Sequence, residues 1–173
     1  RSRHLLDQLL SLARQQAAVT AHQPVDLAAI ARLVVEDLYP LAEQKKLDFG
    51  LELQGEVWVE GTEAALHSLI RNAVDNALRY SPENGEVTIR IRSDGDEGIV
   101  EVIDSGPGIP PEESHRVFDA FYRLPDSAEG GSGLGLTIAR HIADQLGGRI
   151  TLGARSGRQG LVFLYRQRLA PPP

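Results

Sequence analysis

The segment Asn72-Ala-Val-Asp-Asn-Ala-Leu-Arg-Tyr80 lies inside one long amphipathic helix, around which the rest of the chain is organised. Apolar residues recur here with a period near 3.6 and mark the buried face: Ala65, Leu66, Leu69, Ile70, Ala73, Val74 and Ala77. Asn72 and Asn76 share one helix face beside this stripe. An amide at the edge of a core is costly without a hydrogen-bonding partner, so the pair suggests a polar ligand. Two asparagines on a solvated face are the alternative.

The composition is that of an ordinary globular chain. Its 173 residues can hold one domain and an appendage, and 42% of them are hydrophobic. No cysteine is present, which excludes disulfides and thiolate metal sites and fits a reducing compartment. The net charge of −6 argues against a nucleic-acid partner. A polyphosphate ligand would need neutralisation by backbone N–H groups, a metal ion and a few basic side chains.

Hydrophobic periodicity predicts helices and strands in successive blocks. Helices are expected over 1–20, 27–46, 62–81 and 134–146, with a short helix at 111–122; strands are expected over 47–53, 57–59, 86–92, 99–103, 149–154 and 161–168. Asp26 is an expected N-cap, and Gly61-Thr62 is expected to cap the next long helix. This order predicts an α+β fold with a layer of helices on one face of a sheet. The first helix carries a heptad seam and needs a partner helix.

The segment Asp104-Ser-Gly106-Pro-Gly108 places a carboxylate at the end of a buried strand, before a glycine turn. An ionised carboxylate only accepts hydrogen bonds. Adenine offers an amino donor where guanine offers a carbonyl, so a buried Asp104 would favour adenine. An ordinary Asp-Gly turn is the alternative reading.

The segment Gly130-Gly-Ser-Gly133-Leu-Gly135-Leu136 opens directly onto a helix. Small residues let the backbone approach a ligand, and the free N–H groups of a first helical turn favour an anion. No strand leads into these glycines, and no Gly-Lys-Ser or Gly-Lys-Thr occurs, so neither the dinucleotide fingerprint nor the Walker loop is present.

Several side chains near these glycines suit a nucleotide. The amide oxygen of Asn76 can ligate Mg²⁺, Arg79 can meet phosphate, and Tyr80 can cover an adenine face. The aromatic segment 118–123 is either core packing or the anchor of a lid, with Arg123 placed to reach phosphate.

Taken together and in this order, these segments resemble the catalytic ATP-binding domain of bacterial sensor histidine kinases, of the class paired with OmpR-like regulators. Four motifs carry the resemblance: Asn72–Tyr80 resembles the N box, Asp104–Gly108 the G1 box, Phe118–Phe121 the F box and Gly131–Gly135 the G2 box. It extends over 25–169. Residues 1–20 resemble the end of the second helix of the family's dimerisation and histidine-phosphotransfer domain, and 170–173 are expected to be a disordered tail.

The resemblance implies a Bergerat fold, a two-layer α/β sandwich with a mixed, mostly antiparallel sheet, that binds ATP and Mg²⁺. Asn76 would ligate the metal and Asp104 would recognise adenine. The other nucleotide-contacting positions it implies are Asn72, Arg79, Tyr80, Gly106, Gly108, Ile109, Phe121, Gly131, Gly133, Leu134, Gly135 and Leu136. Asn72 and Arg123 are the candidate catalytic residues.

Gyrase-, Hsp90- and MutL-like ATPases share this fold and carry a glutamate base where this chain has Asn72. An amide cannot take a proton at neutral pH, so the site should bind ATP without efficient hydrolysis. The family's phospho-accepting motif is absent, because His4-Leu5-Leu6 does not match it. We therefore expect a fragment that binds Mg-ATP but does not autophosphorylate alone.

The resemblance also implies the context of the whole protein. It would be a homodimeric inner-membrane protein with this domain in the cytoplasm, and its partners would be its own dimerisation domain and an OmpR-like response regulator. Two other classes remain open: a nucleotide-sensing module that acts by docking, and a serine-kinase anti-sigma factor.

Overall fold

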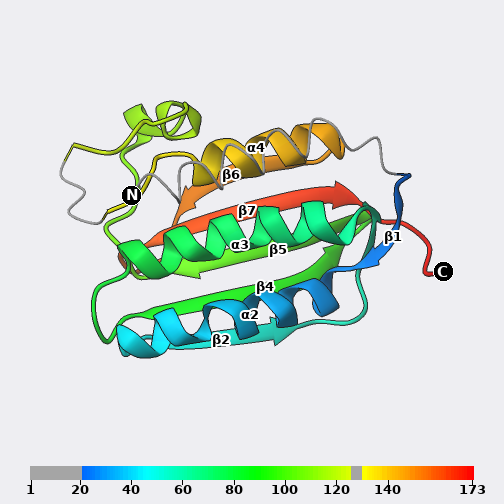
Figure 1. Ribbon diagram of the computed structural model, residues 1–173, viewed down its shortest axis with the longest axis horizontal. Helices are drawn as coiled ribbons and strands as arrows, with labels where there is room; N and C mark the ends of the chain where they lie inside the picture. Colours follow the sequence, from blue (N-terminus) through cyan, green and yellow to red (C-terminus); the bar gives the residue numbers. More distant parts are fainter. Residues whose placement is uncertain (1–20, 126–129) are drawn as a thin grey trace.

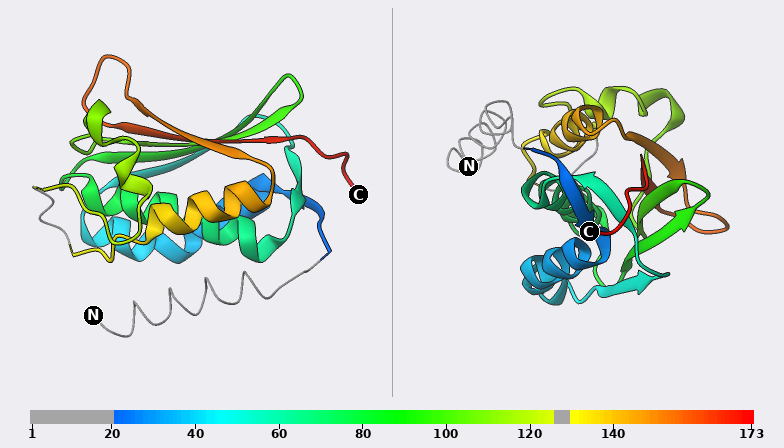
Figure 2. Two further views of the ribbon diagram at one scale, coloured as in Figure 1. Left: turned by 90° about the horizontal axis from the view of Figure 1, so that it is seen from above. Right: turned by 90° about the vertical axis from the view of Figure 1, so that its right-hand side faces the viewer.

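The computed structural model describes residues 21–125 and 130–173, so the helix predicted over 1–20 lies outside the described residues. Three helices cover one face of a five-stranded sheet with strand order β2-β4-β5-β7-β6 (Figures 1 and 2). The strands of this sheet are β2 (Asp48–Leu53), β4 (Glu86–Asp94), β5 (Glu97–Asp104), β6 (Arg149–Ala154) and β7 (Leu161–Arg168). The helices are α2 (Leu27–Gln44), α3 (Glu63–Tyr80) and α4 (Gly135–Gln145).

The sheet is mixed and mostly antiparallel, which confirms the predicted fold class. Only β2 and β4 pair in parallel, while the β4–β5, β5–β7 and β6–β7 pairs are antiparallel. A strand that the sequence did not predict, β1 (Gln23–Asp26), pairs with β3 (Trp58–Gly61) in a separate two-stranded sheet. This strand is four residues long and contains Pro24, so no alternating pattern marks it.

Local side chains start the two long helices as predicted. Asp26 caps α2 by accepting a hydrogen bond from the Ala28 N–H at 2.9 Å. Thr62 caps α3 in the same way, from the Ala65 N–H at 3.2 Å. Both caps satisfy N–H groups that the first helical turn leaves unpaired.

The core lies between the helices and the sheet. The predicted stripe of α3 faces it, and Leu66, Leu69 and Ile70 are fully buried. From the sheet, Val87, Ile89 and Ile91 of β4 point inward at alternate positions and are also fully buried. Burial on this scale anchors α3, and with it every polar side chain that the helix carries.

The short helix predicted at 111–122 is wrong. The structure has two separate 3₁₀ turns there, η1 (Pro111–Glu113) and η2 (Arg116–Phe118). The backbone groups that would continue a helix bind elsewhere: the Thr137 hydroxyl donates to the Phe118 carbonyl at 2.9 Å, and the Phe121 N–H donates to the Gly133 carbonyl at 2.9 Å. Tertiary contacts with the segment around the start of α4 therefore override the local helical pattern.

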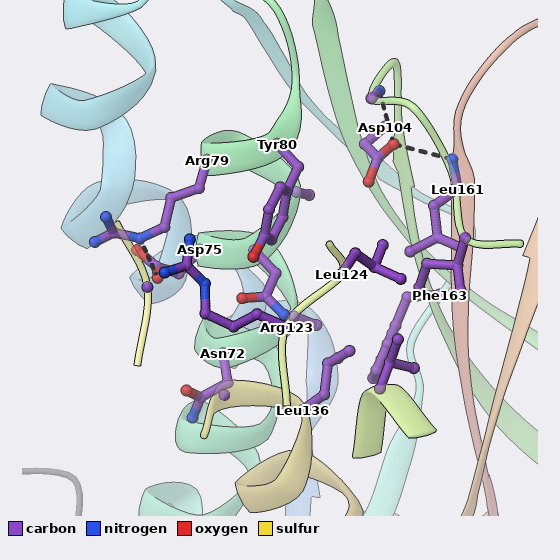
Figure 3. Close-up of a pocket in the computed structure, with 18 of the residues that line it drawn as sticks. Asn72, Asp75, Arg79, Tyr80, Asp104, Arg123, Leu124, Leu136, Leu161 and Phe163 are labelled. Atoms are coloured by element: carbon purple, nitrogen blue, oxygen red, sulfur yellow. Dashed lines mark hydrogen bonds and ion pairs between the residues drawn. The ribbon is translucent and has the colours of Figure 1, made fainter. Parts of the chain in front are cut away.

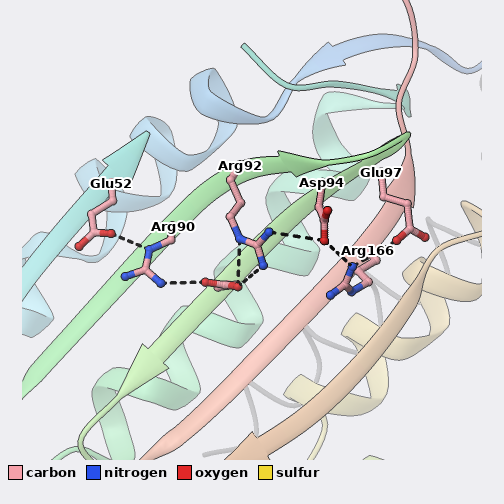
Figure 4. Close-up of polar contacts among 7 residues, drawn as sticks. Glu52, Arg90, Arg92, Asp94, Glu97 and Arg166 are labelled. Carbon is pink, nitrogen blue, oxygen red and sulfur yellow. Dashed lines mark hydrogen bonds and ion pairs between the residues drawn. The ribbon is translucent and has the colours of Figure 1, made fainter. Parts of the chain in front are cut away.

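The other face of the sheet carries a ladder of alternating charges (Figure 4). At its centre Glu101, only 8% exposed, accepts hydrogen bonds from Arg90 at 3.0 Å and from Arg92 at 2.7 Å. Ile99 lies on this same face, opposite Arg92 and Arg166, yet it is fully buried. Long arginine stems can cover apolar surface while their charged ends stay wet. This face is therefore closed by paired side chains, and none of the described helices covers it.

We expect Glu101→Gln to lower the free energy of unfolding by about 1–3 kcal/mol at neutral pH, because two charge-assisted hydrogen bonds are weakened. Burial raises the pKa of Glu101, but Arg92 and Arg90 lower it more, so the folded pKa lies below its ordinary 4.5. A lowered folded pKa stabilises the fold above the unfolded value, and this contribution is lost as pH falls through the folded pKa.

Urea unfolding at about pH 7 and about pH 3.5 checks the effect, and the loss should shrink at the lower pH. Glu52→Gln is the control, because Glu52 is 50% exposed and should change stability by less than about 1 kcal/mol. An equal loss for Glu101→Gln at both pH values would contradict the prediction.

Candidate functional site

A pocket opens between α3, the turn after β5, the segment before α4 and the start of β7 (Figure 3). It brings together most of the site residues predicted from the sequence: Asn72, Asn76, Arg79, Tyr80, Asp104, Gly106, Gly108, Ile109, Arg123, Gly131, Gly133, Gly135 and Leu136. Asn72, Arg79 and Tyr80 line one side from α3, while Asp104, Leu161 and Phe163 come from strands on the other (Figure 3).

Two predicted site residues do not line the pocket. Leu134 is 2% exposed and belongs to the hydrophobic core. Phe121 has a positive φ of 66° and its side chain is 58% exposed. A contact between either side chain and a ligand in this pocket is therefore not supported. Phe121 instead contributes its backbone N–H, which donates to Gly133.

The two asparagines of α3 face the first residue of α4. Asn72 donates its amide N–H to the Ser68 carbonyl at 2.8 Å, which fixes the side chain and leaves its oxygen for the pocket. A Cβ added at Gly135 would lie 3.3 Å from Asn76 Oδ1 and 3.4 Å from Asn72 Oδ1. Glycine thus leaves space where two amide oxygens converge on a helix N-terminus. The Asn76 side chain makes no hydrogen bond within the described residues.

Asp104 is buried at the far end of the pocket, with 5% of its surface exposed. Its Oδ1 accepts hydrogen bonds from the N–H groups of Gly106 and Leu161, each at 2.9 Å (Figure 3). Burial raises the pKa of Asp104, and the two backbone donors and the charge of Arg155 oppose this rise. Since Oδ1 is occupied twice, Oδ2 is the oxygen available to a ligand that donates a hydrogen bond.

Gly160 and Leu161, which hold Asp104, were missed in the sequence. A Cβ at Gly160 would lie 2.0 Å from the Asp104 carbonyl oxygen, and its φ is +147°. Only glycine permits this approach, which brings the Leu161 N–H to the carboxylate. A lone glycine directly before a strand can signal a close backbone approach, and that was the available clue. The apolar wall residues Val102 and Phe163 were also missed, because their strands carried no polar motif.

The other end of the pocket is basic. Arg79 donates to the Asp75 carboxylate at 2.7 Å, one helical turn back, and to the Gly130 carbonyl at 3.5 Å. Arg123 also lines this end. Asp75 was not predicted, but it lines the pocket and orients a guanidinium there.

Gly133 shapes the loop between these cations and α4. Its φ is +74°, and a Cβ there would lie 2.7 Å from the Phe121 carbonyl carbon. The loop therefore closes directly onto the backbone of the F-box segment.

The pocket has an apolar slot with a carboxylate acceptor at one end and amides, guanidinium groups and a helix N-terminus at the other. This distribution suits a flat base that donates a hydrogen bond, joined to an anion. The described residues hold no cluster of three or more His, Asp or Glu side chains that could bind a metal alone. A metal ion here would need ligand atoms from the anion as well.

Comparison with known proteins gives the family. The family described as histidine kinase-, DNA gyrase B- and HSP90-like ATPase matches residues 61–170, and the chain belongs to it. The sensor protein kinase PmrB of Pseudomonas aeruginosa is 39% identical over 166 residues, which cover 92% of this chain and 35% of PmrB. Sensor protein QseC of Escherichia coli is 35% identical over 156 residues, which cover 88% of this chain and 34% of QseC.

Solved structures agree with these relatives. A mycobacterial sensor histidine kinase, MprB, superposes with a TM-score of 0.74 at 28% identity, covering 87% of this chain and 99% of that one. Full-length ShkA superposes with a TM-score of 0.83 at 28% identity, covering 98% of this chain and 36% of ShkA. The resemblance predicted from four short motifs is thus confirmed.

The chain spans about a third of the length of the curated relatives named above. No described helix combines the length and the apolar character that crossing a bilayer requires.

We expect Gly160→Ala to lower the free energy of unfolding by roughly 2–4 kcal/mol, because the new methyl group would overlap the Asp104 carbonyl oxygen. Thermal or urea unfolding measures the loss. Gly157→Ala is the matched control: it lies in the same hairpin loop, its φ is +68° and nothing lies within 4 Å of its Cβ position. That control should cost only about 1–2 kcal/mol. Equal losses for both variants would contradict the close approach.

Proposed function

We propose that the pocket binds ATP with its adenine against Asp104 and its phosphates at the start of α4. The observation that carries this proposal is the buried carboxylate with one oxygen held by two N–H groups and the other left for a donor. An adenine amino group supplies that donor, whereas a guanine carbonyl would face a like partial charge. Full-length ShkA was solved in complex with AMPPNP, an ATP analogue, which supports the same ligand class.

The phosphates would lie at the basic end of the pocket. Arg79 and Arg123 supply positive charge there, and the N-terminus of α4 supplies backbone N–H groups. Local charge is needed because the chain as a whole carries −6. Asp75 holds Arg79 at one turn's distance, so the guanidinium is oriented before the ligand arrives.

The residues present fit a Mg²⁺ ion bound together with the phosphates. Asn76 offers an amide oxygen that faces Gly135, and no other described residue competes for it. Mg²⁺ accepts a single protein ligand when phosphate oxygens and waters complete its shell, and it would neutralise phosphate charge. Asn72 offers a second amide oxygen beside that of Asn76.

The same residues argue against hydrolysis. The position that would polarise a water is Asn72, an amide that cannot take a proton at neutral pH. Its N–H is committed to the Ser68 carbonyl, which keeps the side chain in place. Bound ATP would therefore be positioned and neutralised while its γ-phosphoryl stays available to another nucleophile.

For the whole protein we propose a sensor histidine kinase. The nucleophile would be a histidine of its dimerisation domain in a homodimer, and an OmpR-like response regulator aspartate would receive the phosphoryl group. PmrB and QseC are named as sensor proteins, and a histidine kinase of the same fold, 23% identical, was solved in complex with a response regulator protein. Such a protein would lie in the bacterial inner membrane with this domain in the cytoplasm.

We expect Asp104→Asn to weaken ATP binding roughly 10- to 100-fold, measured by isothermal titration calorimetry. The oxygen of the new amide can still accept from the two N–H groups, but its NH₂ group would then face the adenine amino donor. The preference for ATP over GTP should narrow. Asp144→Asn, an exposed change on α4, is the control for lost charge and should bind like the wild type.

The same variant should raise the thermal midpoint of the nucleotide-free protein at neutral pH. Because the folded pKa of Asp104 is raised above 3.8, the stability that its protonated form provides is present below that value. It is lost as pH rises through the folded pKa. Asparagine stays neutral at every pH, so the thermal midpoints of the two proteins should converge in acid.

In the binding experiment, an Asp104→Asn variant with wild-type affinity for ATP would contradict the adenine assignment.

Transfer chemistry is tested with ATP labelled at the γ position. We expect negligible steady release of inorganic phosphate from the chain alone, and labelling of a separate dimerisation domain that carries the acceptor histidine. Asp104→Asn should lower that labelling in proportion to lost occupancy. Steady turnover without an acceptor would point to a hydrolase, and binding without any labelling would favour a nucleotide-sensing module.

A further inference from the structure

The end of the helix that carries the site is held by a lysine that does not itself line the pocket. Lys45 follows the last turn of α2, and its side chain crosses to the C-terminus of α3. Its ammonium donates to the carbonyl oxygens of Leu78 at 2.9 Å, Arg79 at 2.7 Å and Ser81 at 2.7 Å. These three oxygens converge on one cation from a single stretch of backbone.

This arrangement matches what each partner needs. The last turn of a helix leaves carbonyl groups without partners, and the helix dipole places negative charge there. A lysine ammonium has three N–H donors and no acceptor, so three carbonyls satisfy it completely. Half-burial of the side chain strengthens these charge-assisted bonds relative to bulk water.

The same turn forms one wall of the pocket. Arg79 and Tyr80 line it from α3, and Gly106 lines it from the turn after β5. A Cβ at Gly106 would lie 3.0 Å from the Tyr80 carbonyl oxygen. The turn is thus clamped between Lys45 on one side and the glycine turn that follows Asp104 on the other.

We propose that Lys45 is a positioning residue for nucleotide binding, and that the three carbonyls it fills form a monovalent-cation cage. Rings of backbone carbonyls can replace the hydration shell of K⁺ in this way. In the wild type the Lys45 ammonium occupies this cage. It neutralises the C-terminus of α3 and fixes Arg79 and Tyr80 relative to Asp104. The nucleotide part of this proposal rests on the function proposed above, whereas the cage does not.

The neighbouring lysine gives a matched control. Lys46 pairs with Glu83 at 2.9 Å, and the two side chains are 70% and 61% exposed. Lys45→Met and Lys46→Met therefore remove the same charge from adjacent positions while keeping an unbranched stem. Only the first leaves three carbonyls without their cation.

We expect Lys45→Met to weaken ATP binding about tenfold, a loss of about 1.4 kcal/mol. Lys46→Met should stay within about twofold. Wild-type affinity in Lys45→Met would overturn the positioning role. Failure of the wild type to bind ATP would instead overturn the function proposed for the pocket.

Chemical rescue tests the cage itself. Lys45→Ala leaves space for an ion, so ammonium or potassium chloride should restore ATP affinity to within about threefold of wild type. Tetramethylammonium chloride at equal ionic strength should not restore the affinity, because this ion has no N–H group to donate and is too large for the space that the lysine leaves. No difference between these salts would overturn the cage.

A readout without nucleotide keeps the proposal testable on its own. The Ser81 N–H donates to the Ala77 carbonyl at 3.1 Å in the clamped turn, so its hydrogen exchange reports on that turn. Exchange there should be faster in Lys45→Ala than in the wild type or in Lys46→Met, and ammonium should slow it again. Unchanged hydrogen exchange in Lys45→Ala would refute the positioning role of Lys45, whichever ligand the pocket binds.

Discussion

The burial of the Asp104 carboxylate at the end of the central strand is the constraint on which the rest of the structure depends. A charged group so far from water must be hydrogen-bonded, and one oxygen takes two backbone donors. One donor comes from the adjacent glycine turn, and the other comes from Leu161, 57 residues away. The start of β7 must therefore meet the end of β5, and Gly160 must be glycine for the two backbones to approach.

The pocket is built where helices begin and end, while the opposite face of the sheet carries a network of ion pairs. The C-terminus of α3 contributes carbonyls to which Lys45 donates, and the first residues of α4 line the pocket. Backbone positions with positive φ gather here too, at Gly108, Phe121, Gly133 and Gly160. Across the sheet, the ladder around Glu101 satisfies its own charges. A rigid sheet thus supports a site whose segments are irregular.

In the function proposed above, the polar groups of the pocket bind the nucleotide, and Asn72 offers no base for a water molecule. Asn72 and Asn76 present amide oxygens to the start of α4, where a glutamate would supply a proton acceptor. This choice of side chain fits a family whose members include both kinases and hydrolases. In the proposed function, the Asn72 amide, held in place by the Ser68 carbonyl, favours phosphoryl transfer over hydrolysis on this shared fold.

The sequence alone was sufficient for features that depend on near neighbours. The amphipathic period of α3, the caps at Asp26 and Thr62 and the four motifs with their order are all local, and they identified the family and most of the pocket. Tertiary structure decided the rest. The 3₁₀ turns replace a helix because α4 and the loop before it take their carbonyl and N–H groups. The strand β1 forms only because β3 pairs with it, and Phe121 is exposed and does not line the pocket. Lys45, Gly160 and Leu161 act through partners 33 to 57 residues distant, and no local pattern encodes a contact whose energy comes from the folded chain.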